Sequence, residues 1–509
     1  MVGPLIASTA SFFEKHRRNI HGRLLEGNGG GAHGTMSRKF RKAAFVVFFS
    51  GVLLRTMLAL VNLEANDVDH AEVISIITDQ NRIPDKDEVG EAFQPKLYHA
   101  TVAALWKIIP TQSPPIRIRI GQLVSCTAGV FTLLLALRFF MREIRVSAKV
   151  GFLSFSLLAL NPKLIGINAQ VTNDSFVILF ASLALYFGYR FFENHLAKDF
   201  CSMTIATILA SLSKGNGRVV FMAVLAAFTV ACFQGSNGYS LTIRKTVLYA
   251  SIFLVSFFGV VLRFGPYWEH YRKYGSPFVT NFSLAPFPHV FEKTFFAYPG
   301  VTSITDSLLT FRLFDMLRNP VSTNTKEDYP LHRTSLWSQL YGRAHFVHFD
   351  AWPPSWQLPS SPSWQLPTRV IRNLGRLIFL CALFPTMLLV VAVWKRIAVA
   401  IRWMLSGGKE PHARLSDWLL DLCVFGYIAF IIVYSLRYRD FSVMKAIFIF
   451  PGLFGFLTLF GRECDRFYAW CNQKRALQVS ADVVFISLLL FYTADAIALN
   501  AQLGIRLFR

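Results

Sequence analysis

Acidic residues and cysteines are both scarce in this sequence. It contains 30 aspartates and glutamates against 52 lysines and arginines, and only seven cysteines in 509 residues. The cysteines fall in apolar runs or basic segments, and no Cys-x-x-Cys pair or Cys/His zinc spacing occurs. Neither a disulfide framework nor a zinc site is therefore expected.

Long apolar runs, in contrast, are frequent. Hydrophobic residues make up 53% of the chain, and 49 residues are phenylalanine. Because a hydrocarbon core of ~30 Å takes roughly 20 apolar residues per helix, we predict an all-α polytopic membrane protein with about 11 transmembrane helices and interfacial helices in the first outside loop. The predicted spans are 43–63, 119–140, 150–168, 174–192, 201–214, 218–234, 246–263, 371–394, 416–436, 443–460 and 481–500.

The distribution of the net charge, which is +22, predicts the orientation. Lysines and arginines gather in every second connection, which is the positive-inside pattern of membrane proteins and needs no nucleic-acid partner. The N-terminus is then cytoplasmic, and the long outside loops are 64–117 and 264–370. We expect four parts: a disordered basic cytoplasmic tail at 1–42, an N-terminal transmembrane module carrying the chemistry at 43–263, a long non-cytoplasmic loop at 264–370, and C-terminal transmembrane helices at 371–509.

Carboxylates concentrate in the first outside loop, where nine of the 30 acids lie between Glu64 and Glu91. Most of them fit a solvated loop. Asp67, Asp69 and His70 differ, because they follow the first span at the membrane surface, where ionisable groups are costly and commonly functional. One carboxylate could act as a general base, or the pair could bind a divalent cation; helix N-capping is the alternative.

Three further groups of polar residues are expected on the same side of the membrane. A turn between the third and fourth spans has more polar residues than capping needs, which fits binding of a polyhydroxylated or phosphorylated group. Cations near the outside surface could bind a lipid phosphate, or could extend to the interface as ordinary surface charges. The candidates are Gln94, Lys96 and Tyr98 in the first loop, Asn168, Gln170, Asn173 and Asp174 in the turn, and the cations Lys214, Arg437, Arg439 and Lys445.

The order of these motifs resembles that of the GT-C membrane glycosyltransferases, especially protein-O-mannosyltransferase-like enzymes and bacterial aminoarabinose and lipopolysaccharide sugar transferases. The resemblance runs from about Phe45 to Pro451. It is most specific in three motifs: NDVDHAE at 66–72, QPKLYH at 94–99 and NAQVTNDS at 168–175.

The resemblance implies a sugar carried on a polyprenyl phosphate and transferred outside the cytoplasm, with inversion, to a glycan, lipid or protein acceptor. The first-loop acid, Asp67 or Asp69, would activate the acceptor, with His70 beside it. The membrane would be the plasma membrane in a bacterium or the endoplasmic reticulum in a eukaryote. The resemblance requires no cofactor, although Mg²⁺ or Mn²⁺ would fit the paired carboxylates.

Two departures from the family pattern affect the donor site. Relatives often have proline and tyrosine where this chain has Lys96 and His99, and an arginine that helps hold the lipid phosphate where this chain has Ile447. Lys96, Arg439 or Lys445 would then have to contact the phosphate.

Two other functions remain open at this point. A transporter would need ionisable groups at mid-membrane or paired broken helices, whereas the predicted spans hold few charges, with Arg55 and Arg138 near span ends. An inactive GT-C-like membrane scaffold would agree with the missing arginine but not with the retained acids.

Overall fold

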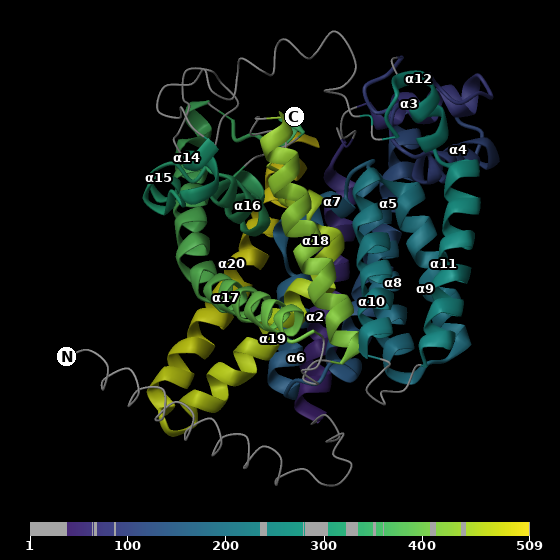
Figure 1. Cartoon of the computed structure of the whole chain (residues 1–509). Helices are drawn as coiled ribbons and strands as arrows, with labels where there is room; N and C mark the ends of the chain where they lie inside the picture. Colours follow the sequence, from purple (N-terminus) through teal and green to yellow (C-terminus); the bar gives the residue numbers. More distant parts are fainter. Residues whose placement is uncertain are drawn as a thin grey trace. The chain divides into compact units, whose positions relative to one another are not determined.

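The computed structural model describes the chain from residue 38 to residue 507 with several gaps. The described residues are 38–63, 65, 69–85, 88–234, 242–277, 279, 304–321, 334–349, 353–359, 361–407, 414–438 and 444–507. Their regular elements are all helical, and the described residues from Lys42 onward belong to one compact unit (Figure 1). The prediction of an all-α polytopic membrane protein is confirmed.

Eight helices in the described part are long and apolar enough to cross a membrane. A ninth span results if α6 (Ala148–Ala159) and α7 (Pro162–Asn168), which are bent by 49°, are counted together. The eight are α2 (Arg38–Val61), α5 (Pro114–Arg138), α8 (Asp174–Asn194), α10 (Arg218–Gln234), α11 (Ile243–Phe264), α17 (Gln365–Leu405), α18 (Leu415–Tyr438) and α20 (Arg475–Leu507).

The count of eleven spans is not confirmed, although each predicted span coincides with helical structure. The helix in the place of 201–214 is α9 (Ala197–Ser213), which has only 17 residues. The helix in the place of 443–460 is α19 (Leu453–Trp470), which starts after Pro451 and carries four charged residues in its second half. Neither helix is therefore counted among the eight.

Proline and asparagine explain the break between α6 and α7. Pro162 lacks the backbone N–H that would continue α6, and its fixed φ suits the first turn of a new helix. The Asn161 side chain caps that helix by accepting a hydrogen bond of 2.8 Å from the Leu164 amide. The chain thus changes direction just before the polar turn that begins at Asn168.

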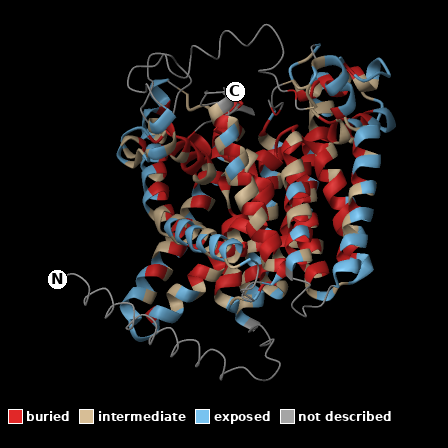
Figure 2. Cartoon of the chain, in the orientation of Figure 1, coloured by how far each residue is buried: buried red, intermediate tan, exposed pale blue. Residues whose placement is uncertain are grey.

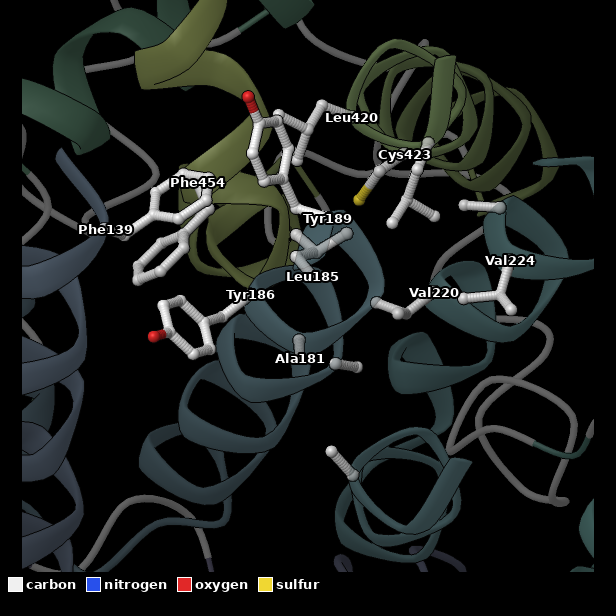
Figure 3. Close-up of a cluster of buried hydrophobic side chains, with 14 of the residues drawn as sticks. Phe139, Ala181, Leu185, Tyr186, Tyr189, Val220, Val224, Leu420, Cys423 and Phe454 are labelled. Carbon is white, nitrogen blue, oxygen red and sulfur yellow. The ribbon is translucent and has the colours of Figure 1, made fainter. Parts of the chain in front are cut away.

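Helix α8 lies at the centre of the bundle and α11 at its periphery. In their most apolar windows, 67% of the residues of α8 are buried inside the protein but only 17% of those of α11. Figure 2 shows the outward faces of α11 and α17 as exposed. Around α8, the side chains of α5, α10, α18 and α19 form the largest apolar core, part of which is drawn in Figure 3.

Short helices cover the end of the bundle that carries the first outside loop. Helices α3 (His70–Asp79) and α4 (Leu97–Ile108) pack against each other, and α12 (Tyr267–Tyr274) follows α11 (Figure 1). The described part of 264–370 also contains α14 (Ile304–Leu309), α15 (Leu313–Arg318) and α16 (Leu336–His345).

The duplicated PSWQLP sequence forms two short 3₁₀ turns, Pro354–Trp356 and Pro362–Trp364. A Trp-rich surface loop at the lipid interface would be the expectation from its composition. Instead both tryptophans are buried, and the Trp356 indole donates a hydrogen bond to Asn62 Oδ1 at 3.3 Å. The repeat therefore fastens the second outside loop to the end of α2.

Candidate active site

Described residues of the first outside loop make contacts with the rest of the protein on both sides of residues 66–68. Asp67 is one of these three residues, which lie outside the described part of the chain. Asp69 adopts a left-handed conformation with φ of 59°, and its Oδ2 accepts a hydrogen bond from the Gly90 amide at 3.2 Å. Although Asp69 directly precedes α3, its side chain makes no capping bond to that helix.

His70 and His99 form a buried pair between α3 and α4. His70 Nδ1 and His99 Nε2 are 2.9 Å apart, and the two rings are stacked. Burial, followed by the nearby positive charges of His70, Lys96 and Lys214, holds the pKa of His99 well below its usual range. His99 is therefore the neutral partner, and two of the predicted cations lie close enough to act on it.

A backbone hydrogen bond joins the first loop to the polar turn before α8. The Val171 amide donates to the Ala65 carbonyl at 2.8 Å, and Asn62 Nδ2 donates to the Ala169 carbonyl at 3.2 Å. The polar turn and the residues just before the NDVDHAE motif, separated by about 100 residues in the sequence, thus meet in the structure. Sequence alone does not indicate this contact.

In the first half of the polar turn, the side chain of Asn168 connects helices of the protein through hydrogen bonds. Asn168 Oδ1 accepts a hydrogen bond from Arg55 Nε at 2.9 Å, and its Nδ2 donates to Ser175 Oγ at 3.0 Å. Arg55, placed near a span end by the sequence, is fully buried within α2 and also donates to the Ala159 carbonyl at 2.7 Å. Gln170 is buried beside this network.

The second half of the turn holds a buried ion pair. Lys214 Nζ lies 2.7 Å from both carboxylate oxygens of Asp174, and Thr172 Oγ1 donates to the same carboxylate at 3.0 Å. Next to this pair, the Asn173 side chain is fully buried, and neither its amide nitrogen nor its oxygen has a hydrogen-bond partner among the described residues. A buried amide in this condition is rare and calls for a partner.

A cavity of about 80 Å³ opens beside Lys214. Its polar lining includes three groups that can carry positive charge, Lys214, Arg218 and His270, together with Gln94 from the first loop. Tyr267, Tyr434 and Phe448 supply aromatic surface, and the Arg218 guanidinium lies 4.7 Å from the centre of the Tyr267 ring. Such a lining suits an anionic group attached to an apolar body.

A tight turn between α9 and α10 positions both Lys214 and Arg218. A side chain at Gly217 would place its Cβ 2.2 Å from the Ala210 carbonyl oxygen, so only glycine allows this close approach. Asn216 Nδ2 donates to the Phe448 carbonyl at 3.0 Å, which fastens the turn to the late segment before α19.

The remaining predicted residues lie outside this cavity or outside the described part. Lys96 donates to the Ala92 and Gln94 carbonyls, and the Tyr98 hydroxyl donates to the Gly121 carbonyl at 3.0 Å. Lys445 directly precedes the 3₁₀ turn Ala446–Phe448 and does not line the cavity. Asp67, Arg439 and the side chain of Arg437 fall outside what the structure describes.

Sequence reasoning did not select Arg218, His270 or Tyr267. Arg218 belongs to the same Lys-Gly-Asn-Gly-Arg turn as Lys214, and a cation four residues later in a glycine turn could have been selected with it. His270 and Tyr267 lie on a short helix whose sequence, YWEHYRKY, is strongly amphipathic, but its packing partner was not predictable. Within the described segments, no three His, Cys, Asp or Glu side chains are close enough together to hold a metal ion.

Comparison with known families gives one match in sequence. Residues 102–262 match the family of dolichyl-phosphate-mannose-protein mannosyltransferases. This confirms the resemblance to GT-C glycosyltransferases. The GT-C match covers α5 to α11, including the polar turn, Asp174, Lys214 and Arg218. No curated protein matches the chain in sequence.

Two solved GT-C structures are distantly similar to the chain. Oligosaccharyltransferase AglB from Archaeoglobus fulgidus, in complex with an inhibitory peptide and a dolichol-phosphate, is 14% identical with a TM-score of 0.48. The match covers 92% of this chain, which spans only 56% of the length of AglB. ArnT from Cupriavidus metallidurans, bound to undecaprenyl phosphate, is 16% identical with a TM-score of 0.31, over 83% of this chain and 76% of ArnT.

Proposed function

We propose that this protein transfers a sugar from a polyprenyl-phosphate donor to an acceptor on the non-cytoplasmic face of the membrane. A first-loop aspartate, Asp67 in preference to Asp69, acts as the general base. The proposal rests on the GT-C match over 102–262 and on one structural observation: the polar turn, fastened to the first loop at Ala65, carries Asp174, and Asp174 holds the cavity-lining cation Lys214.

The reaction is a single displacement at the anomeric carbon. The acceptor oxygen attacks that carbon, the bond to the phosphate oxygen breaks, and the acceptor proton passes to the aspartate. The leaving polyprenyl phosphate gains negative charge, which Lys214 and Arg218 neutralise in the cavity. The Asn173 amide, which has no hydrogen-bond partner among the residues that the structure describes, supplies a donor and an acceptor suited to sugar hydroxyl groups.

Asp67 is preferred to Asp69 because the carboxylate of Asp69 already has a structural partner. Its Oδ2 accepts the Gly90 amide, which binds the start of α3 to the following loop. A general base must be able to reach the acceptor hydroxyl directly, at hydrogen-bond distance or through one water.

Paired neutralisation of Lys214 and Asp174 tests the donor site. Lys214→Gln alone would leave a buried carboxylate without its cation, which typically costs ~3–5 kcal/mol of stability. The double variant Lys214→Gln/Asp174→Asn removes both charges and keeps a hydrogen-bonded pair, so it should fold. We expect its rate of transfer from a polyprenyl-phosphate sugar to fall on the order of 10²-fold, as for loss of one electrostatic contact to the transition state.

The control variant is Lys149→Gln/Asp482→Asn, which neutralises a different Lys–Asp pair of the same protein. Both double variants should melt near the wild-type temperature. Near wild-type transfer by the well-folded Lys214→Gln/Asp174→Asn protein would show that this pair is structural and that the cavity is not the phosphate site.

A further inference from the structure

A second charged cavity lies far from the candidate active site, at the other end of α8. It has a volume of about 340 Å³ and is lined by Tyr189 of α8 and by six charged residues. Tyr189 is fifteen residues beyond Asp174, about 22 Å along the helix at 1.5 Å per residue. The charged lining residues are Arg145, Arg414, Asp417, Arg462, Asp465 and Arg466.

Four arginines in one cavity are only partly compensated by carboxylates. Arg145 and Arg414 share a single carboxylate, that of Glu193, at 2.9 and 3.5 Å. In the same way, Arg466 lies 3.0 Å from the carboxylate of Glu463, which also pairs with Lys395.

The two lining aspartates reduce this excess but do not remove it, because five cations (the four arginines and Lys395) face four carboxylates (Glu193, Glu463, Asp417 and Asp465). Asp417 pairs with Arg462, one cation for one carboxylate. Asp465 instead accepts hydrogen bonds from the Ser147 amide and hydroxyl, at 2.7 and 2.6 Å. Because a guanidinium has five N–H donors in a planar fork, arginines that share carboxylates keep donors available for another anion.

The cavity is placed at the level of the ends of several spans. Arg145 follows α5, Tyr189 is in the last turns of α8, and Arg414 directly precedes α18. In the predicted orientation this is the cytoplasmic end, where basic pockets between transmembrane helices meet lipid headgroups. Tyr189 lines the cavity, and in Figure 3 its hydroxyl points away from the buried apolar cluster.

We propose that this arginine cavity binds a phosphate group, either that of an anionic lipid headgroup or a soluble phosphate. Arginine is the side chain best suited to phosphate oxygens, because it can donate two parallel hydrogen bonds to them. The site is independent of the proposed transferase chemistry, since it involves neither Lys214 nor the first outside loop.

The test uses the purified full-length protein in neutral detergent with two probes, dioctanoyl phosphatidic acid and inorganic phosphate. The variant is Arg145→Gln/Arg466→Gln, whose side chains are 57% and 59% exposed. In this variant Glu193 still pairs with Arg414, and Glu463 still pairs with Lys395. Neither carboxylate is therefore left without a cation. The matched control, Arg138→Gln/Arg402→Gln, removes the same charge outside the cavity.

We expect the dissociation constant to rise about tenfold or more in the cavity variant, because each lost guanidinium removes charge-assisted hydrogen bonds to the phosphate, and to stay unchanged in the control. Binding of both probes identifies a site for phosphate in general, and binding of phosphatidic acid alone identifies a lipid headgroup site. The proposal is overturned if neither probe binds, or if the cavity variant and the control bind equally well.

Discussion

The two aspartates that open the first outside loop differ in what their side chains can do. Asp69 is in the left-handed region, which asparagine tolerates better than other residues except glycine, and an asparagine oxygen can still accept the Gly90 amide. We therefore expect Asp69→Asn to retain near wild-type transfer.

Asp67→Asn should keep folding and donor binding but lower the turnover by ~10²–10⁴-fold, the usual loss for a general base. The measurement is the initial rate of sugar transfer at saturating donor, with Asp69→Asn as the matched control. If both variants transfer sugar at the wild-type rate, neither carboxylate is the base and the first-loop argument fails.

For single residues, the sequence indicated which side chains belong to the candidate site better than it indicated which of them contact each other. Lys214 could be selected because a cation on the outside of the membrane departs from the positive-inside pattern. Its partner Asp174 lies 40 residues earlier, and nothing in either motif indicates that the two meet at 2.7 Å. The same is true of His70 and His99, which belong to two different motifs and form a buried pair in the structure.

Among the elements, the packing of α3 on α4 has a pH dependence that can be measured. His99 is buried in this contact, and its pKa is lowered below the ordinary value of 6.5. The unfolded chain therefore binds a proton that the folded protein does not, so this contribution to stability is full above pH 6.5 and is lost as the pH falls below it. We expect the melting temperature to fall as the pH is lowered from ~7 to ~5.

The variant His99→Gln keeps a hydrogen-bonding group beside His70 but cannot titrate. Its stability should depend less on pH, by up to ~1.4 kcal/mol per pH unit. Part of the pH dependence of stability will persist in this variant, because burial also lowers the pKa of His345 in α16 to about 4. His345 therefore also makes the protein less stable as the pH falls from 6.5 to 4. An unchanged slope in His99→Gln would mean that His99 is not the buried neutral group described above.

Helix positions were predictable from apolar runs, whereas the number of full spans was not. Apolar periodicity locates a helix, but a span also needs sufficient length and few charges. Arg462, Glu463, Asp465 and Arg466 bring charge into α19. Arg462 pairs with Asp417 of α18 and Glu463 pairs with Lys395 of α17, so contacts with other helices stabilise two of these four charges. The tertiary contacts that make such a helix stable cannot be seen in a single sequence.

For the whole molecule, the central prediction is that the two outside loops share one side of the membrane. Ser361 lies in the second outside loop and Asn472 in the predicted cytoplasmic connection between α19 and α20, and both side chains are exposed. In a background without the native cysteines, Ser361→Cys should react with an impermeant maleimide only from outside the cell or from the lumen. Asn472→Cys, the opposite control, should react only after the membrane is permeabilised.

Labelling of Ser361→Cys from the cytoplasm alone would reverse the orientation and remove the non-cytoplasmic assignment of the site. The exposure of both side chains ensures that a lack of reaction reports on the side of the membrane and not on burial.

The bond from Val171 to Ala65 also has a consequence for timing. The Val171 amide is buried, and its hydrogen can exchange with solvent deuterium only when the first loop separates from the turn before α8. When exchange from the separated state is faster than reclosing, the exchange rate equals the rate of that separation and can be measured without substrate. If acceptor entry requires the loop to lift, the opening rate measured at this one amide is an upper limit on the number of acceptors that one molecule can admit per second.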